Sequence, residues 1–448
     1  MEVTTTDAQM IENLSNWLQS ELGFSVKSIE RQARQRPAWF IEAVGKNGPV
    51  SLYARGERPQ QNEAFGLENE MAIQQQLGKN GITVPHIYGL CPSPKAVIMD
   101  QKPGTEIVSD LGVDEKRRLM FNYVEILANM HAIDIEQFVE IGLKRPSNAR
   151  DSVLGGLDRY TSVFREMKSK PEPFLEFVLT WLERNVPADS SKPSIICWDA
   201  GQFLHHEGEI TTLLDLELAH LGDPLEDLAS IRMREPSFDF GNIIEIYDHY
   251  AKVVGKPVDR DTIDYHCIAF AMTNPISHFD ALLNPSTETN YMVYKKWCNK
   301  TSMWALDLIS QRQNIKLDHL PWPKEKKSPF APAYRHLLEV IDELPKRDEF
   351  EEYKVGSISR LAEHLKRADE IGEETIAGDI EDLQKFFGVP VASWEAGEEL
   401  LEKFILEAGP ESDADIVWLL YRRLERELFL LSTPGAFNAI QPTLQSIR

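Results

Sequence analysis

The sequence has few cysteines, a deficit of positive charge and no long apolar run. Its four cysteines, at positions 91, 197, 267 and 298, lie far apart without a CxxC pair. That spacing argues against a disulfide scaffold and against a structural zinc site. Lys and Arg number 48 against 71 Asp and Glu, which gives a formal net charge of −23. Because nucleic acids and anionic membranes attract basic proteins, we expect neither as a partner.

Signals for export or membrane insertion are also lacking. No apolar run approaches the roughly 18 residues that a membrane-spanning helix needs. Residues 1–7 lack the basic end and the apolar stretch of a signal peptide. We therefore expect a soluble, cytoplasmic protein, and 448 residues predict two to four domains at roughly 150 residues each.

The first hundred residues predict a small sheet-rich lobe. A helical spacing of apolar residues covers positions 7–22, and a second helix is expected at 67–77. Extended patterns rich in branched and aromatic residues follow one another at 24–29, 38–44, 50–55, 84–90 and 96–99. The turn sequence at 46–49 makes the second and third of these an antiparallel hairpin, and we set this lobe at residues 1–101.

Beyond residue 101 the pattern is mainly helical. Residues 102–311 form a predicted helical lobe, interrupted by β-rich runs at 195–197 and 210–218 that we interpret as an embedded hairpin. Residues 312–329 combine three prolines with a charge cluster and predict a linker, followed by an all-helical domain at 330–448. The predicted fold is α+β: a small antiparallel β lobe, a larger helical lobe and an added helical domain. A small β lobe joined to a helical lobe is typical of two-lobed kinases.

Three acidic residues in the embedded hairpin are the main candidates for chemistry. Asp199 follows the first run, while Asp215 and Glu217 lie two positions apart in the second. If the second run is a strand, both side chains project from the same face. Buried carboxylates need a cation, which Arg, Lys or Mg²⁺ could supply. The alternative for Asp215 is an ion pair or an exposed acid on a surface hairpin.

The residues after this run predict a helix start. Asp223 suits the N-cap, Pro224 the first helical position, and Glu226 the third, where its carboxylate completes a capping box. We interpret Asp223 and Glu226 as structural residues that fix the helix beside the acidic segment.

These stretches resemble a known enzyme family. The segments Leu-Asp-Leu-Glu at 214–217, Gly-Asp-Pro-Leu-Glu-Asp-Leu-Ala at 222–229 and Met-His-Ala-Ile-Asp at 130–134 resemble motifs of aminoglycoside phosphotransferase-like kinases, of the protein-kinase-like fold. The resemblance spans roughly residues 20–311, and its subgroup is similar to phosphotransferase domains found with acyl-CoA dehydrogenases. It implies that Asp199 is the catalytic residue and that Asp215, supported by Glu217, binds magnesium.

The sequence departs from the family pattern near Asp199. Where the family has His-Gly before the aspartate, this chain has Cys197-Trp198. Gln202 is the only amide near the position of the family's magnesium-binding Asn, so it is our candidate second ligand, the alternative being a loop residue bonded to backbone. Cys197 lies in an apolar run and favours packing over a nucleophilic role.

The kinase-like fold also implies nucleotide contacts in the small lobe. A cation on the second hairpin strand pairs with a Glu on the next helix, and here these residues are Arg55 and Glu70. An exposed ion pair is the alternative. The expected phosphate loop has no glycine but carries Arg34 and Arg36. Met99 and Gln101 lie at the expected hinge, where adenine would bind backbone groups.

These features lead to two hypotheses. The first is a kinase that uses ATP and Mg²⁺ to phosphorylate a hydroxyl of a small molecule, with a hydroxyacyl thioester or another catabolic alcohol as the candidate acceptor. The second is a catalytically weak or inactive kinase-like protein that binds a nucleotide or a partner. The helical domain at 330–448 could mediate a homodimer or bind a partner subunit.

Overall fold

The computed structural model describes residues 7–32, 34, 36–57, 66–188, 192–287, 289–433 and 443–448. The chain divides into two compact units. Unit 1 comprises residues 1–156, 189–260 and 445–448, and unit 2 comprises 157–188 and 261–444. The domain bounds 1–101, 102–311, 312–329 and 330–448 remain predictions from sequence.

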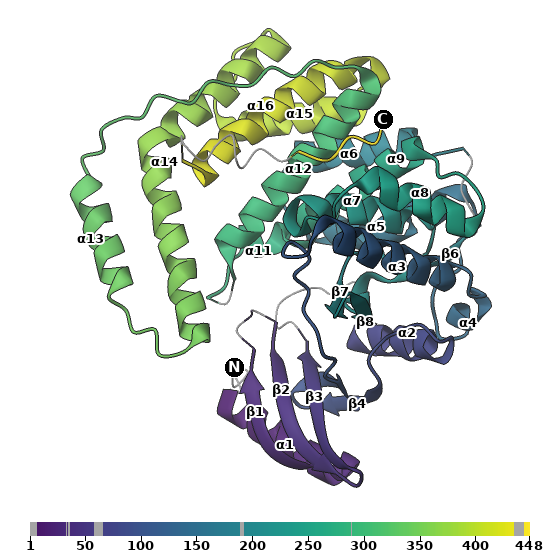
Figure 1. The fold of residues 1–448 in the computed structure, drawn as a ribbon. Helices are drawn as coiled ribbons and strands as arrows, with labels where there is room; N and C mark the ends of the chain where they lie inside the picture. The colour runs from purple at the N-terminus through teal and green to yellow at the C-terminus, as the bar shows by residue number, and fades with distance from the viewer. Residues whose placement is uncertain are drawn as a thin grey trace. The chain divides into compact units, whose positions relative to one another are not determined.

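Unit 1 begins with the predicted antiparallel sheet (Figure 1). Its strands are β1 (Ser25–Arg31), β2 (Ala38–Gly45), β3 (Gly48–Gly56), β4 (Ile87–Pro92) and β5 (Lys95–Asp100), in the order β1-β2-β3-β5-β4. The hairpin between β2 and β3 closes with Gly45 opposite Gly48, as the turn sequence predicts. The helices α1 (Asp7–Leu22) and α2 (Leu67–Lys79) are confirmed as well.

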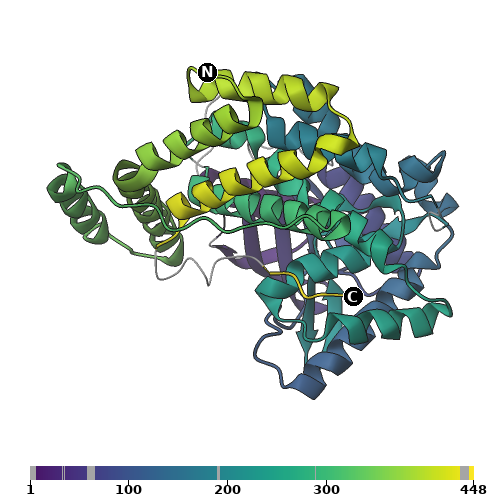
Figure 2. The ribbon, with the colours of Figure 1, turned by 90° about the horizontal axis from the view of Figure 1, so that it is seen from above.

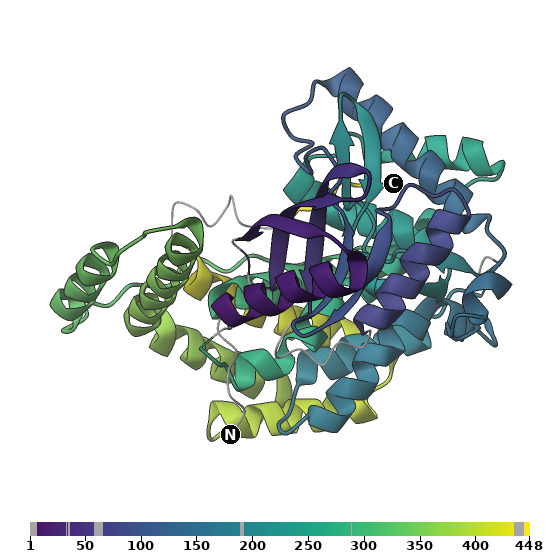
Figure 3. The ribbon, with the colours of Figure 1, turned by 90° about the horizontal axis from the view of Figure 1, so that it is seen from below.

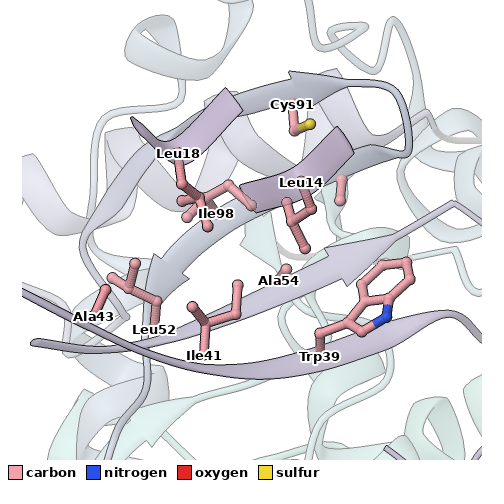
Figure 4. Packing of buried hydrophobic residues seen from close by; sticks show 10 residues of the cluster. Leu14, Leu18, Trp39, Ile41, Ala43, Leu52, Ala54, Cys91 and Ile98 are labelled. Carbon is pink, nitrogen blue, oxygen red and sulfur yellow. The ribbon is translucent and has the colours of Figure 1, made fainter. Parts of the chain in front are cut away.

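Helix α1 lies across one face of this sheet and closes its core (Figure 3). Leu14 and Leu18 from the helix meet Trp39, Ile41 and other alternate residues of the strands (Figure 4). Side chains of a strand alternate between faces, so one apolar face suffices for this core. The packing fixes β3, the strand that carries Arg55.

The rest of unit 1 is helical with short strands. Its elements are α3 (Val113–His131), α4 (Glu136–Val139), the start of α5 (Ala149–Met167), β6 (Ser194–Ile196), β7 (Phe203–His206), β8 (Glu209–Leu213), η1 (Leu216–Leu218), β9 (His220–Gly222), α7 (Leu225–Phe238) and α8 (Ile243–Val254). The predicted cap positions at α7 were wrong by one residue, because the helix begins at Leu225 and its N-cap is Pro224. Asp223 and Glu226 still bond across the helix start, where Asp223 N–H donates to Glu226 Oε1 (3.0 Å) and Leu225 N–H donates to Asp223 Oδ1 (2.9 Å).

The predicted hairpin was wrong in its pairing and its length. β6 pairs with β9, and β8 pairs with β7, so 195–197 and 210–218 are not partners. Strand β8 ends at Leu213 because Asp215 adopts a left-handed backbone (φ 55°) and the next three residues form a 3-10 turn. Asp215 and Glu217 therefore do not share a strand face. The alternating leucines that suggested a strand come partly from this turn.

Unit 2 is built from packed helices (Figures 1 and 2). They are the end of α5, α6 (Pro173–Arg184), α9 (Arg260–Ala271), α10 (Thr273–Ser277), α11 (Phe279–Leu283), α12 (Tyr291–Gln313), α13 (Ala331–Asp342), α14 (Glu349–Phe387), α15 (Trp394–Glu407), η2 (Pro410–Ser412) and α16 (Asp413–Leu431). Helix α16 packs along α12 and α14. No helix in the described part of the chain is both long and apolar enough to span a bilayer.

We predict that Leu18→Ala destabilises the sheet lobe by about 2–5 kcal/mol, because it leaves a cavity under α1. Leu18 is fully buried, whereas Gln19 on the same helix is exposed. Urea denaturation measures the change, and Gln19→Ala, expected within about 0.5 kcal/mol of the wild type, is the control. Equal effects of the two substitutions would contradict this account of the core.

Candidate functional site

A buried charge cluster joins the sheet to the acidic segment of unit 1. Arg55 on β3 binds Glu70 of α2 (Nε to Oε1, 3.1 Å). The same guanidinium reaches Asp215, and its Nη2 lies 3.3 Å from Oε2 of Glu217. The predicted pairing of Arg55 with Glu70 is thus present and buried rather than exposed, and the strand and helix that carry it meet at the turn η1.

Arg36 joins the same cluster from the loop before β2. Its Nη1 donates to Glu217 Oε2 (2.5 Å), and its Nε donates to the Gly56 carbonyl oxygen (2.8 Å). Only 3% of Arg36 is exposed. These acceptors offset part of the cost of burying the guanidinium.

The cluster brings three carboxylates together with two guanidinium groups. Burial lowers the pKa of Arg55, but Asp215, Glu70 and Glu217 outweigh it and raise that pKa well above its usual value. Burial raises the pKa of Glu70, against the opposing effect of Arg55 and Arg36.

Asp199 lies in the loop after β6 and is held by a second arginine. Arg234 of α7 donates Nε to Oδ1 (2.6 Å) and Nη2 to Oδ2 (2.5 Å), and Gln202 Nε2 donates to Oδ2 (2.7 Å). Burial raises the pKa of the Asp199 carboxyl, which Arg234 opposes. Asp215 and Glu217 raise the same pKa further, so the three predicted acids influence one another.

Side chains hold the backbone of this loop. Asp227 accepts N–H groups from Cys197 (3.1 Å) and Trp198 (2.7 Å). Ser230 Oγ accepts that of Ala200 (2.9 Å), and Tyr123 Oη accepts that of Gly201 (2.6 Å). The loop that carries Asp199 is thus fixed although it belongs to no helix or strand.

The sequence reasoning missed Asp227 and Arg234 as neighbours of Asp199. Asp227 also contacts His131 Nε2 (3.0 Å), so two motifs quoted for the resemblance meet here. The motif that begins with Gly-Asp-Pro at 222–224 includes Asp227, which directly follows Glu226, so the motif could have pointed to Asp227 as a functional neighbour. Arg234 lies further along α7 and had no such signal.

The other nucleotide residues lie outside the charge cluster. Arg34 is half-buried, and its side chain makes no ion pair among the described residues. Met99 lies in β5 and packs against Leu67 of α2 and Ile87 of β4. Gln101 donates its backbone N–H to Ser51 (3.1 Å), so adenine recognition there would need its carbonyl oxygen.

The donor set agrees in chemistry with magnesium. Mg²⁺ takes oxygen ligands, with only one or two carboxylates and several waters or phosphate oxygens. Asp215 and Glu217, in the Arg55 cluster, and Gln202, beside Asp199, carry such oxygen donors. Within the described residues, no group of three or more His, Cys, Asp or Glu side chains forms a ready metal cage. Any Mg²⁺ here would therefore complete its shell with ligands from outside the protein.

Comparison with known proteins agrees with this arrangement. Residues 26–260, about half of the chain, match the phosphotransferase enzyme family, APH. The chain belongs to this phosphotransferase family. The matched segment contains every residue singled out from the sequence, from Arg34 to Glu217.

Relatives of this phosphotransferase are longer proteins. Acyl-CoA dehydrogenase family member 11 of Rattus norvegicus is 22% identical over 53% of this chain and 32% of the relative. Family member 10 of Mus musculus is 24% identical over 37% of this chain and 16% of the relative. The chain therefore spans at most about a third of the length of these relatives.

Solved structures of phosphotransferases show a distant likeness. Macrolide 2'-phosphotransferase type I has a TM-score of 0.46 and 18% identity, over 63% of this chain and 94% of that one. An aminoglycoside phosphotransferase mutant in complex with ADP and hygromycin B has a TM-score of 0.47 and 14% identity, over 65% and 98%.

The tryptophan before Asp199 departs from the family but keeps the backbone expected of glycine. Trp198 has φ 62°, in the left-handed region that glycine favours. Its side chain is 1% exposed and packs edge-on against His220 (5.1 Å between centroids). Burial of the indole offsets the backbone strain, which costs of order 1–2 kcal/mol.

We predict that Trp198→Gly and Trp198→Ala both destabilise the phosphotransferase, because each loses the buried indole. The glycine variant should be the more stable of the two by about 1 kcal/mol, since only it relaxes the left-handed backbone. Urea denaturation of both variants measures the difference. If the alanine variant equals or exceeds the glycine variant, the left-handed conformation does not strain this position.

Proposed function

We propose that this phosphotransferase is a kinase that uses ATP and Mg²⁺ to phosphorylate a hydroxyl group of a small molecule. The observation that carries the proposal is that Arg55 pairs with Glu70 and also contacts Asp215 and Glu217. A catalytic carboxylate, metal-binding acids and a phosphate-binding cation are the parts that phosphoryl transfer requires.

Each part has a proposed task. Arg55, oriented by Glu70, binds the nucleotide phosphates, and Arg36 and Arg34 supply further positive charge from the preceding loop. The hinge at Met99 and Gln101 contacts adenine through backbone groups. Because Arg55 and Arg36 now bind the acids, nucleotide phosphates would compete with Asp215 and Glu217 for them.

Magnesium would be held by Asp215, Glu217 and Gln202. When bound, Mg²⁺ neutralises charge on the phosphate oxygens. The chain's own contribution to transfer lies at Asp199, which orients the acceptor hydroxyl and receives its proton. The acceptor oxygen forms a bond to the γ-phosphorus while the bond to the bridging oxygen breaks and ADP leaves with that electron pair.

The acceptor we favour is a small alcohol without multiple positive charges, such as a hydroxyacyl thioester or another catabolic alcohol. Arg234 pairs with Asp199, so the charge of that carboxylate is already balanced and would attract a polycation less strongly. The names of the relatives, acyl-CoA dehydrogenases, agree with an acyl-derived acceptor.

The helical domain at 330–448 is our proposed site for a homodimer or a partner subunit, within a cytoplasmic protein that binds neither nucleic acid nor membrane. Helices α13 and α14 expose large apolar side chains, among them Leu337, Val340, Leu361 and Leu365. Exposed apolar groups along adjacent helices are common at protein interfaces.

A second candidate, a catalytically weak protein that binds nucleotide or a partner, is favoured by one observation. All three predicted acids already make strong ion pairs with arginines, and Asp199 accepts three hydrogen bonds. If nucleotide does not release these arginines, the protein would bind ATP without transferring phosphate.

We predict that Asp199→Asn lowers kcat by about 10²–10⁴-fold, because the amide cannot accept the hydroxyl proton. Binding of ATP with Mg²⁺ should persist and stabilise both proteins, by about 2.7 kcal/mol at 100 times Kd. Coupled ADP release across an alcohol panel and thermal unfolding with nucleotide measure the two effects. Asp114→Asn, whose side chain is 81% exposed on α3, is the control.

The outcomes separate the two functions. Stabilisation by nucleotide without transfer to any alcohol, and with no effect of Asp199→Asn, would favour the second candidate. Absence of stabilisation by any nucleotide would exclude the kinase and a nucleotide-binding protein alike.

A further inference from the structure

Arg234 contacts an aromatic ring on its own helix as well as the Asp199 carboxylate. Its guanidinium carbon lies 5.5 Å from the ring centre of Phe238, one turn further along α7. The loop approaches from the other direction, where a Cβ added at Gly201 would lie 3.4 Å from Arg234 Cδ and 3.0 Å from the Phe240 ring. Gly201 also has φ +91°, so a side chain there is disfavoured by the backbone conformation as well as by the close contact with Phe240. The glycine thus leaves room for the Phe240 ring and lets the loop contact the Arg234 side chain.

The hydrogen bonds on Asp199 divide its two oxygens unequally. A carboxylate has about four lone-pair positions, two on each oxygen. Arg234 Nη2 and Gln202 Nε2 both donate to Oδ2, while Arg234 Nε alone donates to Oδ1. Among the contacts of the described residues, one acceptor position therefore remains, and it belongs to Oδ1.

We propose that Arg234 is a positioning residue for phosphoryl transfer, which holds the Asp199 carboxylate so that Oδ1 receives the acceptor hydroxyl. The inference rests on the proposed kinase function and extends it to a residue outside the motifs that carried the resemblance. Gln202 assists by occupying Oδ2.

A bidentate arginine suits this task because phosphoryl transfer depends on orientation more than on a strong base. In the loose transition state, catalysis is mainly positioning and electrostatic stabilisation. Two parallel hydrogen bonds fix the plane of a carboxylate, which the single point charge of a lysine cannot do. A pair that served stability alone would lower the amount of folded protein without a selective effect on kcat.

We expect Arg234→Gln to lower kcat about 10–100-fold, the range typical of residues that orient a catalytic group. The KM for ATP should stay within about twofold, because Arg234 contacts Asp199 and not the Arg55 cluster. The kcat of Arg234→Lys should lie between that of Arg234→Gln and that of the wild type. In Arg234→Ala, added guanidinium ion should restore part of kcat by occupying the vacated place, whereas sodium at equal ionic strength should not.

Arg117→Gln is the matched control, since Arg117 also pairs with a carboxylate, Glu245, but on exposed surface away from the loop. Unchanged kcat in Arg234→Gln would overturn the inference. A rise in the KM for ATP as large as the fall in kcat would also overturn it. So would a fall in the kcat of Arg234→Ala that added guanidinium does not relieve. A wild-type chain that binds nucleotide and transfers phosphate to no acceptor would instead defeat the proposed function itself, and this inference with it.

Discussion

The contact on which the site depends is the buried guanidinium of Arg55. One cation from strand β3 meets Glu70 from helix α2 and two acids from the turn η1, segments about 15 and 160 residues away along the chain. An unpaired buried charge is strongly destabilising, so these three elements reach low free energy only when assembled together. The sheet core under α1 matters to function for this reason, because it sets where β3 presents its arginine. Arg36 extends the same constraint to the loop before β2.

A second constraint acts on the loop after β6. Its residues lie outside helix and strand, so their backbone N–H groups need other partners. Asp227, Ser230 and Tyr123 supply them, and Arg234 fixes the carboxylate that the loop presents. Helix α7 contributes three of these four residues, so the position of this helix sets the position of the loop. The structural residues of α7 and the proposed catalytic residue Asp199 thus depend on each other for their positions, although their proposed roles differ.

Much of the fold followed from local patterns. The hairpin of β2 and β3 was predictable because its turn sequence and alternating residues agree, and α1 because its apolar residues repeat with helical spacing. The pairing of β6 with β9 was not predictable, since three-residue strands carry little pattern and their pairing is decided by packing. The error at Asp215 has the same origin. Leucines around a 3-10 turn imitate a strand, and only the left-handed backbone at Asp215 shows where β8 ends.

The sequence by itself determined which residue types are present for chemistry: the acids Asp199, Asp215 and Glu217, the cation Arg55, and the motifs that indicate a phosphotransferase. Motif spacing can do this because it reflects local backbone geometry. Only the tertiary structure decided that Arg36 folds into the acidic cluster, that Trp198 adopts a glycine-like backbone, and that Arg234 holds Asp199. These contacts join residues about 20 to 180 positions apart or depend on burial, and sequence patterns report neither.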